Sequence, residues 1–304
     1  MNIFTRRQAL GLTSAWLLHS STWAVATNAT VNISYAPLAQ LEKKVGGRLG
    51  VALLNTGNGN VVGHRLHERF GMCSTFKLAL AAEVLRKIDQ GTLKSDQWVT
   101  YGQADIMSHA PVAKEHLAHG GMTVLAMAEA IQTTSDNTAA NALLKLIGGP
   151  VAFTQLLRAG GDQVTRVDRM EPEMNLVGPG EVRDTTTPHA AALTAQRQLL
   201  GGWLKPDSNR LGIRWLDATD TGTKRLRAGF SAGWRSGDKT GTGMTKGIAD
   251  KYNDIAIAWP PGKAPLIVTA YYETATNSGG EMRDSDQAVL AEVGRIATAW
   301  RLES

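Results

Sequence analysis

The strongest constraint on the fold is the order in which strand-like and helix-like segments follow one another. Apolar or alternating runs typical of strands lie near both ends of the chain, at residues 48–55, 60–66, 232–239, 254–259 and 266–273. Amphipathic runs typical of helices lie between them and at the very end, at residues 74–89, 137–147, 151–159, 188–200 and 284–300. The simplest packing joins the two strand-bearing ends in one sheet. We therefore expect an α+β fold.

This order also predicts two lobes. Residues 27–66 and 217–304 would form an α/β lobe, an antiparallel sheet with flanking helices, and residues 67–216 would form an all-helical lobe. The turn TGNG at 56–59 predicts a hairpin, and Thr187 is placed to cap the helix that Pro188 opens.

The composition is that of a globular chain with a weak basic excess. Of the 304 residues, 43% are hydrophobic and 19% charged, which supplies a sizeable core. The formal charge is +5; without residues 1–26 it is +3, from 30 basic and 27 acidic residues, a weak indication of nucleic-acid binding. No apolar run reaches the roughly 18–20 residues of a membrane-spanning helix. The single cysteine, Cys73, excludes an intrachain disulfide.

The N-terminus has the features of an export signal. Arg6 and Arg7 precede a mildly apolar stretch, and AVA at 24–26 offers a small-residue cleavage site. The paired arginines favour the twin-arginine route, with an ordinary signal peptide as the alternative. No cysteine lies near the cleavage site to carry a lipid. We therefore expect a periplasmic or secreted protein with no stable membrane anchor.

Two suggestive patterns do not carry chemistry. GFSAG at 229–233 matches the nucleophile elbow of α/β-hydrolases, but that mechanism needs a histidine later in the chain, and all seven histidines precede Ser231. The histidine pairs at 64/67 and 116/119 lack the H-E-x-x-H pattern and a nearby cysteine. We expect a turn before a strand at 229–233 and no metal.

The pattern S-x-x-K occurs at Ser74 with Lys77 and again at Ser236 with Lys239. Ser74 opens a helix, so Lys77 lies one turn later on the same face, and the helix N-terminus favours developing negative charge. A lysine there can take the serine proton if its pKa is depressed. Ser236 lies on an expected strand, where positions three apart point to opposite faces. Ser74 is the candidate nucleophile, against the alternative of an ordinary helix cap.

Three further motifs accompany this pair. SDN at 135–137 lies just before a helix, and KTG at 239–241 lies on an expected strand. EPEMN at 171–175 lies in a segment of about 169–186 with little regular pattern, and a loop that long inside a compact domain is usually functional. Ser135 follows Ser74 by 61 residues, and Lys239 follows Ser135 by 104.

The ordered set S-x-x-K, S-D-N, E-P-E-x-N and K-T-G resembles class A serine β-lactamases, which belong to the penicillin-recognising serine hydrolases. The resemblance covers the chain from about Ala36 to the C-terminus. It implies a two-lobe β-lactamase/transpeptidase-like fold, hydrolysis of penicillin- or cephalosporin-type β-lactams and no cofactor. The implied partner is a small-molecule β-lactam bound by a monomer.

The resemblance also implies catalytic roles. Ser74 would attack the lactam carbonyl, and Lys77 and Glu171 are both candidates for the base of that step. Glu171, with Asn175 holding a water, would bring about deacylation. Ser135 would pass a proton to the leaving nitrogen.

Binding roles follow in the same way. Backbone N–H groups of Ser74 and Thr242 would form the oxyanion hole, and Asn137 would bind the substrate's side-chain amide. The other positions implied to bind the substrate or line the site are Lys239, Thr240, Gly241, Thr242, Arg225 and His109. An ion pair between Arg169 and Asp184 would hold the ends of the family's Ω loop.

The sequence departs from the family pattern at several positions. The region after K-T-G lacks the arginine that many relatives place on this strand, and an extended turn is expected at 249–252; Arg225 sits where other members carry a substituting arginine. A cysteine directly before the nucleophile, here Cys73, resembles a feature of a carbapenem-hydrolysing subgroup. That subgroup has a second cysteine at the position of Gly243, which this chain lacks. His109 falls where the family usually has an aromatic wall.

Two rival functions share part of the pattern. A penicillin-binding DD-peptidase has S-x-x-K and K-T-G but usually lacks the Glu171/Asn175 water site and stays acylated. A non-hydrolysing β-lactam receptor would need a membrane anchor or a partner domain. The lifetime of the covalent adduct with penicillin separates all three.

Overall fold

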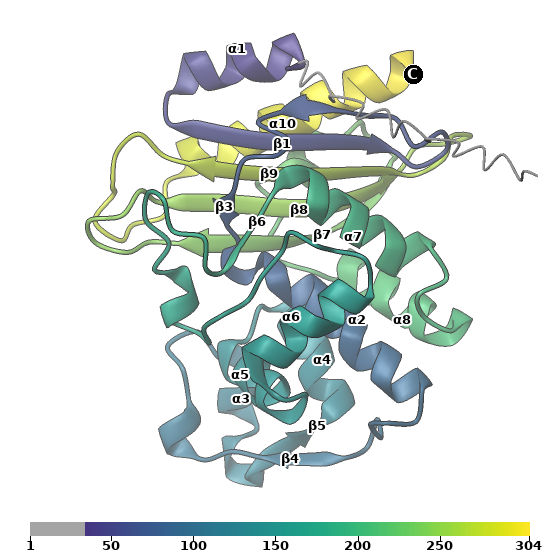
Figure 1. Ribbon diagram of the computed structural model, residues 1–304, viewed down its shortest axis with the longest axis vertical. Coiled ribbons are helices and arrows are strands. Elements are labelled where there is room, and N and C mark those ends of the chain that lie inside the picture. The colour runs from purple at the N-terminus through teal and green to yellow at the C-terminus, as the bar shows by residue number, and fades with distance from the viewer. Residues whose placement is uncertain (1–33) are drawn as a thin grey trace, which may run out of the picture. The chain divides into compact units, whose positions relative to one another are not determined.

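Strands from both ends of the chain form one antiparallel sheet in the computed structural model, which describes residues 34–304 (Figure 1). The strand order is β2-β1-β9-β8-β7, and every neighbouring pair is antiparallel. The strands are β1 (Arg48–Asn55), β2 (Val61–His64), β7 (Arg235–Gly243), β8 (Lys251–Trp259) and β9 (Leu266–Glu273). The expected α+β fold and the first hairpin are confirmed. The expected export signal, residues 1–26, lies outside the described residues.

Helices cover both faces of the sheet (Figure 1). One face packs against α1 (Ala36–Val45), α9 (Leu226–Gly229) and α10 (Asp284–Glu303), the other against α7 (Pro188–Leu200) and α8 (Pro206–Asp217). In β1, Leu49, Val51 and Leu53 join the first core, whereas Ala52 and Leu54 join the second. Because successive strand side chains point to opposite faces, a sheet covered on both sides requires a continuous apolar run.

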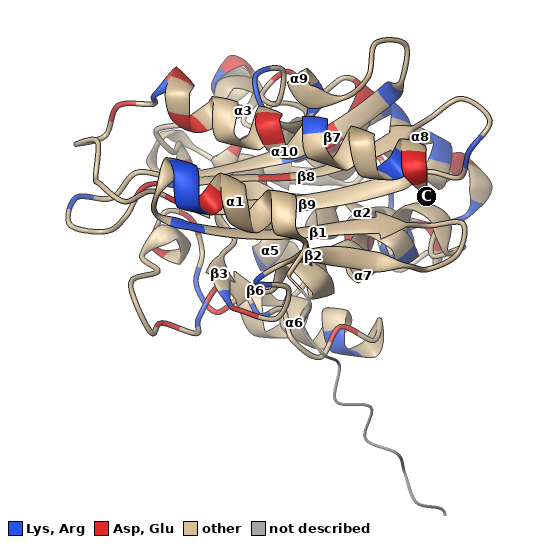
Figure 2. Cartoon of the chain, turned by 90° about the horizontal axis from the view of Figure 1, so that it is seen from above, with Lys and Arg blue, Asp and Glu red and all other residues tan. Residues whose placement is uncertain are grey.

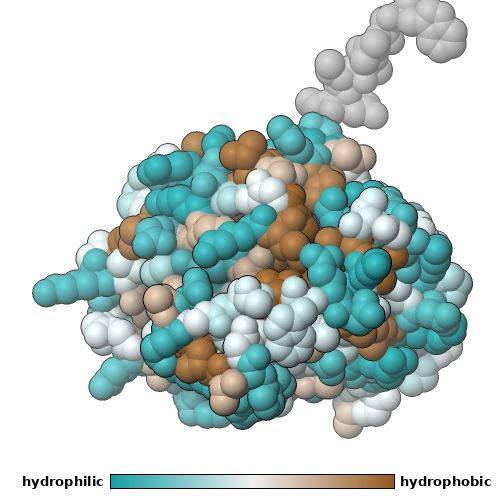
Figure 3. Space-filling model, turned by 90° about the horizontal axis from the view of Figure 1, so that it is seen from below, coloured by the Kyte–Doolittle hydropathy of each residue, from teal (hydrophilic) through white to brown (hydrophobic). Residues whose placement is uncertain are grey.

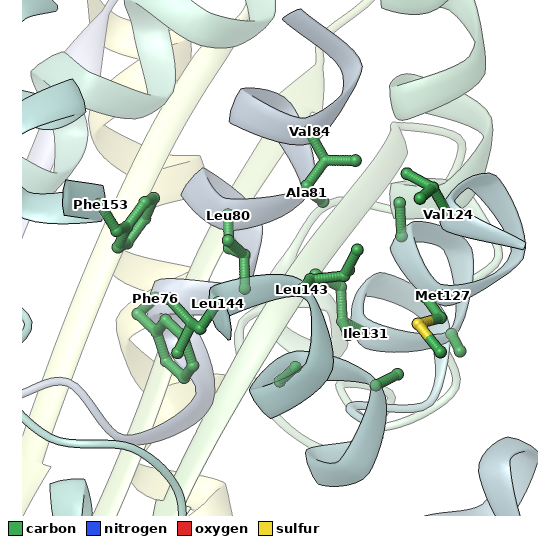
Figure 4. Close-up of a cluster of buried hydrophobic side chains, with 14 of the residues drawn as sticks. Phe76, Leu80, Ala81, Val84, Val124, Met127, Ile131, Leu143, Leu144 and Phe153 are labelled. Atoms are coloured by element: carbon green, nitrogen blue, oxygen red, sulfur yellow. The ribbon is translucent and has the colours of Figure 1, made fainter. Parts of the chain in front are cut away.

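A further core lies among the helices from the middle of the chain (Figure 4). Phe76, Leu80 and Val84 of α2 (Phe76–Asp89) are four residues apart and share one face of the helix. They pack in a cluster with α4 (Val124–Thr133), α5 (Asn137–Leu146) and α6 (Gly149–Ala159). The short elements β4 (Trp98–Thr100), α3 (Pro111–Glu115) and β5 (Gly121–Thr123) lie at the end away from the sheet.

The expected lobe boundaries at 66/67 and 216/217 stay a prediction. α7 and α8, placed in the helical lobe by sequence, pack against the sheet. Leu78 of α2 joins the same buried cluster as Ile213 of α8 and Ile255 of β8. Helices α2, α7 and α8 therefore share one buried cluster with the sheet.

Two strands differ from their expected bounds. The strand expected at 232–239 runs from Arg235 to Gly243, and the one expected at 254–259 begins at Lys251. The prediction of an extended turn at 249–252 was wrong for residues 251 and 252. These residues belong to β8, where Lys251 pairs with Gly243 and Tyr252 with Thr242. Backbone pairing, which hydrophobic periodicity does not report, decides where these strands end.

Charged and hydrophobic residues are interspersed with residues of other kinds in the views of Figures 2 and 3. Lysine and arginine alternate with aspartate and glutamate in Figure 2. Hydrophobic areas are interrupted by hydrophilic ones on the face shown in Figure 3. Within residues 34–304 no single helix is long and apolar enough to cross a membrane; α5 and α6 qualify by length and composition only as a pair, bent by 75°.

Candidate active site

Ser74 lies in a tight turn that leads into α2. A 3-10 turn spans Cys73–Thr75 and α2 begins at Phe76, so the helix expected from Ser74 starts two residues later. β7 packs directly against this turn: a Cβ on Gly241 would lie 2.7 Å from the Met72 carbonyl oxygen and 3.1 Å from Ser74 N. Glycine at 241 therefore allows the strand to approach the nucleophile.

Cys73 is packed behind the nucleophile. The side chain is 1% exposed, and burial raises the pKa of the Cys73 thiol to about 12. Its backbone has φ +47°, a left-handed conformation that is uncommon for a residue with a Cβ. A Cβ on Gly243 would lie 2.8 Å from Cys73 Sγ. The thiol is a buried, neutral packing group.

Lys77 lies at the centre of a buried hydrogen-bond network. Its Nζ donates to Ser74 Oγ at 3.0 Å, and to the carbonyl oxygen and the hydroxyl of Ser135 at 2.7 and 3.3 Å. It also donates to Asn137 Oδ1 and lies 3.6 Å from Glu171 Oε1. Burial lowers the pKa of Lys77, against the opposing attraction of Glu171 and other nearby acids. A depressed pKa is what a lysine needs to act as a base.

The S-D-N segment reaches Lys77 from the start of α5. Asp136 caps this helix: its Oδ1 accepts from Ala139 N and its Oδ2 from Ala113 N, both at 2.9 Å. Ser135 has φ +62°, so its backbone also adopts the left-handed conformation. With the cap supplied by Asp136, the side chains of Ser135 and Asn137 are free to contact Lys77.

Glu171 completes the cluster from the segment 169–186. Its Oε1 lies 3.4 Å from Ser74 Oγ, and its Oε2 accepts from Asn175 Nδ2 at 2.6 Å. The backbone of Glu171 is held by Asn141 of α5, which accepts from Glu171 N at 3.0 Å and donates to Glu171 O at 2.9 Å. Asn175 Oδ1 is buried and has no hydrogen-bond partner among residues 34–304. This atom is available to a small polar molecule beside Glu171.

The expected ion pair at the ends of this segment is confirmed. Arg169 Nε donates to Asp184 Oδ2 at 2.5 Å. Asp184 Oδ1 also accepts from the backbone N–H groups of Asp168 and Arg169, at 2.7 and 2.9 Å. The next residues form β6 (Thr185–Thr186), which pairs with β3 (Phe70–Gly71) just before the nucleophile turn. The loop that carries Glu171 is thus anchored beside Ser74.

β7 supplies the cationic side of the site. Lys239 is fully buried, and its Nζ donates to the Thr240 carbonyl oxygen at 2.9 Å. Burial, with added repulsion from Lys77, lowers the pKa of Lys239 to about 7. The hydroxyl of Thr240 contacts that of Thr221 at 2.7 Å.

Arg225 reaches the same strand from the segment before α9. Its guanidinium donates to Thr242 Oγ1 at 2.6 Å, and to the carbonyl oxygens of Gly241 and Asn253 at 3.0 and 2.8 Å. The side chain is 2% exposed, and burial lowers its pKa. Arg225 therefore adds positive charge next to Thr242.

His109 and two unexpected residues complete the arrangement. His109 is exposed; its Nε2 lies 2.9 Å from Thr134 O, and its carbonyl oxygen accepts from Asn137 N at 2.9 Å. Sequence reasoning missed Asn141 and Thr221. Asn141 follows Asn137 by one helical turn, a spacing that was available as a signal. Thr221 has no such signal, because its partner lies on a distant strand.

The chain is similar to known proteins over nearly its whole length. The Beta-lactamase enzyme family matches residues 35–300. Identity to Beta-lactamase L2 of Stenotrophomonas maltophilia is 47% over 260 residues, 85% of this chain and 83% of that protein. Identity to Carbapenem-hydrolyzing beta-lactamase KPC of Klebsiella oxytoca is 39% over 284 residues, 92% of this chain and 94% of that protein.

Solved structures agree with these matches. An ancestral class A β-lactamase superposes with a TM-score of 0.81 at 51% identity, over 87% of this chain and 98% of that one. A β-lactamase from Burkholderia vietnamiensis superposes with a TM-score of 0.83 at 43% identity, over 88% of this chain and 96% of that one. All the candidate site residues lie inside the region matched by the family.

Proposed function

The chain belongs to the class A serine β-lactamase family and hydrolyses β-lactams, and on this premise we propose that Ser74 forms an acyl-enzyme that a Glu171-activated water hydrolyses. The observation that carries this assignment is the contact of Glu171 with both Ser74 and Asn175, at 3.4 and 2.6 Å. A nucleophile and a base with its own orienting group are what covalent catalysis requires.

Acylation uses the Lys77 network. Ser74 Oγ attacks the lactam carbonyl carbon, the C–N bond breaks, and the serine proton leaves for a neighbouring base. Lys77 and Glu171 both lie within reach of Ser74 Oγ, at 3.0 and 3.4 Å. Ser135, which also contacts Lys77, delivers a proton to the leaving nitrogen. The negative charge on the carbonyl oxygen is stabilised by N–H groups of Ser74 and Thr242.

Deacylation uses Glu171 and Asn175. A water between these side chains donates one proton to Glu171 as its oxygen attacks the acyl carbon. The ester bond to Ser74 breaks, and the serine oxygen regains a proton. Asn175 Oδ1, buried and without a partner among the described residues, can accept the second hydrogen of the water.

Substrate is held by the cationic strand and the S-D-N segment. Lys239, Thr240 and Thr242 bind the carboxylate that penicillins and cephalosporins carry, with Arg225 adding charge through its contact with Thr242. Asn137 binds the side-chain amide, and His109 lines the entrance. Gly241 contributes its close backbone approach to Ser74.

Replacing Glu171 tests the assignment. Glu171→Gln should acylate with penicillin and then retain the adduct, because the amide cannot accept the water's proton. Intact-mass measurement should show one penicillin on Ser74 for minutes, while the wild type clears it within seconds. Glu173→Gln, an exposed change in the same turn, is the matched control and should turn over normally.

Four outcomes of this experiment are distinct. Rapid turnover in Glu171→Gln removes Glu171 from the mechanism. A persistent adduct in the wild type indicates instead a DD-peptidase or a β-lactam receptor. Slower acylation in Glu171→Gln assigns the first proton to Glu171, and unchanged acylation assigns it to Lys77.

We also propose that the protein acts outside the cytoplasm as a monomer and gives resistance to β-lactams. Support for export comes from Arg6, Arg7 and the AVA segment at 24–26. Replacing both arginines by lysine should retain activity in the cytoplasm and abolish resistance in cells, as cell fractionation would show. Light scattering should give the molar mass of a single chain in solution.

A further inference from the structure

A cavity of about 570 Å³ lies among the Ω loop, β3 and the turn that joins β7 to β8. Residues 177–182 and 247–249 form two of its walls. Its charged lining residues are Arg48, Glu68, Arg69, Glu181, Lys251 and Glu273. None of these side chains has a part in the mechanism above.

The cavity lining carries three basic and three acidic side chains, but the acidic ones are paired with only some of the basic ones. Arg48 pairs with Glu68 at 3.2 Å and with Glu273 at 2.7 Å, and Glu181 pairs with Arg183 at 2.5 Å. Within residues 34–304, Lys251 and Arg69 have no carboxylate oxygen within 4.0 Å. In the described part of the chain, the acceptors of Arg69 are the Val164 carbonyl oxygen and the Thr185 hydroxyl. The cavity wall thus carries two cations without an acidic partner in the described chain.

Lys251 is the more unusual of the two. Its side chain is 2% exposed, yet its Nζ donates to a single described acceptor, the Ala249 carbonyl oxygen at 3.3 Å. An ammonium group has three N–H donors, and burying a charge without a partner is costly. The lysine stem lies against Gly71, where a Cβ would be 3.0 Å from Lys251 Cε. The Lys251 side chain is therefore held in place, while two of its three N–H donors have no acceptor among the described residues.

We propose that this cavity binds a small organic anion whose anionic oxygens contact Lys251, with Arg69 as the second cation. The volume falls within the usual range of small-molecule sites, roughly 300–1,000 Å³. A phosphate or a carboxylate supplies the charge and the acceptors that the two cations lack. The occupant contacts residues 177–182 and 247–249 together, so it ties the Ω loop to the sheet.

Thermal unfolding with added anion tests this site. Inorganic phosphate and succinate are titrated separately at constant ionic strength, and either should raise the midpoint saturably because it binds only the folded state. A response to phosphate alone indicates a phosphorylated ligand, and a response to succinate alone a carboxylate. Lys251→Met keeps the aliphatic stem and should abolish the rise. Lys246→Met, an exposed change in the same turn, should leave it intact.

An equal rise in wild type and Lys251→Met places the anion elsewhere, including at Lys239, and overturns the proposal. The absence of any saturable rise in the wild type does the same. Should Lys251→Met not fold, wild-type crystals soaked in the same anion decide the question. Anion density within hydrogen-bond distance of Lys251 Nζ supports the site, and water alone in the cavity overturns it.

Discussion

Burial changes the acid–base chemistry of two lysines beside the nucleophile. Lys77 and Lys239 are both fully buried, and burial is the largest cause of the lowered pKa of each. Lys77 contacts Asn137 and Glu171, whereas the positive charge of Lys77 repels that of Lys239. The first lysine is thereby suited to exchange protons and the second to bind an anion that restores its charge.

The pH dependence of catalysis should report Lys239. Its pKa of about 7 in the free enzyme means that it loses its proton as pH rises through this value. Carboxylate binding favours the charged form, so kcat/KM for benzylpenicillin should fall above pH 7, and kcat should fall less. Lys239→Arg should move the fall to higher pH, because arginine stays protonated. Identical pH profiles for the two enzymes would contradict this role.

The lowered pKa of Lys239 also makes the free energy of unfolding depend on pH. The unfolded state binds the Lys239 proton up to about pH 10.4. Between this value and about 7 the unfolded state holds more protons than the folded state, so the contribution of Lys239 to stability increases with pH across this window.

Arg225 should be required for substrates that carry a carboxylate. Arg225→Ala should cost about 1.5–3 kcal/mol in kcat/KM for benzylpenicillin, the usual value of a hydrogen bond to a charged group. The methyl ester of the same penicillin is the control, because it lacks the charge. Equal losses with both substrates would assign to Arg225 only the support of Gly241 and Asn253 that its contacts already show.

At the scale of elements, the Ω loop depends on Asp184. This buried carboxylate accepts from Arg169 Nε and from two backbone N–H groups at the start of the loop. Asp184→Asn should lower the free energy of unfolding by about 1–3 kcal/mol, since it leaves buried donors poorly satisfied. Because the loop carries Glu171, the variant should also deacylate slowly.

Pre-steady-state kinetics checks this prediction. Asp184→Asn should show an acylation burst of normal amplitude followed by a reduced steady rate. Arg183→Met, which removes an exposed ion pair with Glu181, is the matched control and should change neither quantity by much. A normal steady rate in Asp184→Asn would show that the ion pair does not position Glu171.

At the scale of the whole molecule, the helices and the sheet should unfold together. Leu78, Ala192 and Ile213 lie in the segment 67–216 but pack in one cluster with Ile255 of the sheet. The isolated segment 67–216 would expose this apolar surface to water, so we expect it to show no cooperative thermal transition. The full chain should show one transition, with loss of activity and of near-ultraviolet circular dichroism at the same temperature. A cooperative transition in the isolated segment would show that it folds independently of the sheet and would contradict this prediction.

Hydrophobic periodicity was sufficient for much of the fold, because it follows directly from which residues face a core. β1, β9 and α7 have the bounds expected from sequence. α1, α4 and α8 were missed, and the ends of β7 and β8 were set by pairing between strands. Local context, a helix start at Ser74 and a strand at Ser236, was sufficient to select Ser74 as the candidate nucleophile. The order of the motifs supplied the family resemblance that assigns Glu171 and Asn175 to the same site.

The sequence by itself determined which side chains are available for the chemistry: the ordered motifs, the single cysteine and the residues that the family resemblance assigns. Only the tertiary structure decided their state. Lys77 and Lys239 have lowered pKa values because segments far apart in the chain exclude water from both. Packing of distant segments also brings Asn141 to the backbone of Glu171 and buries Lys251 against Gly71. Burial and contact depend on which distant segments pack together, and no local pattern of residues records that.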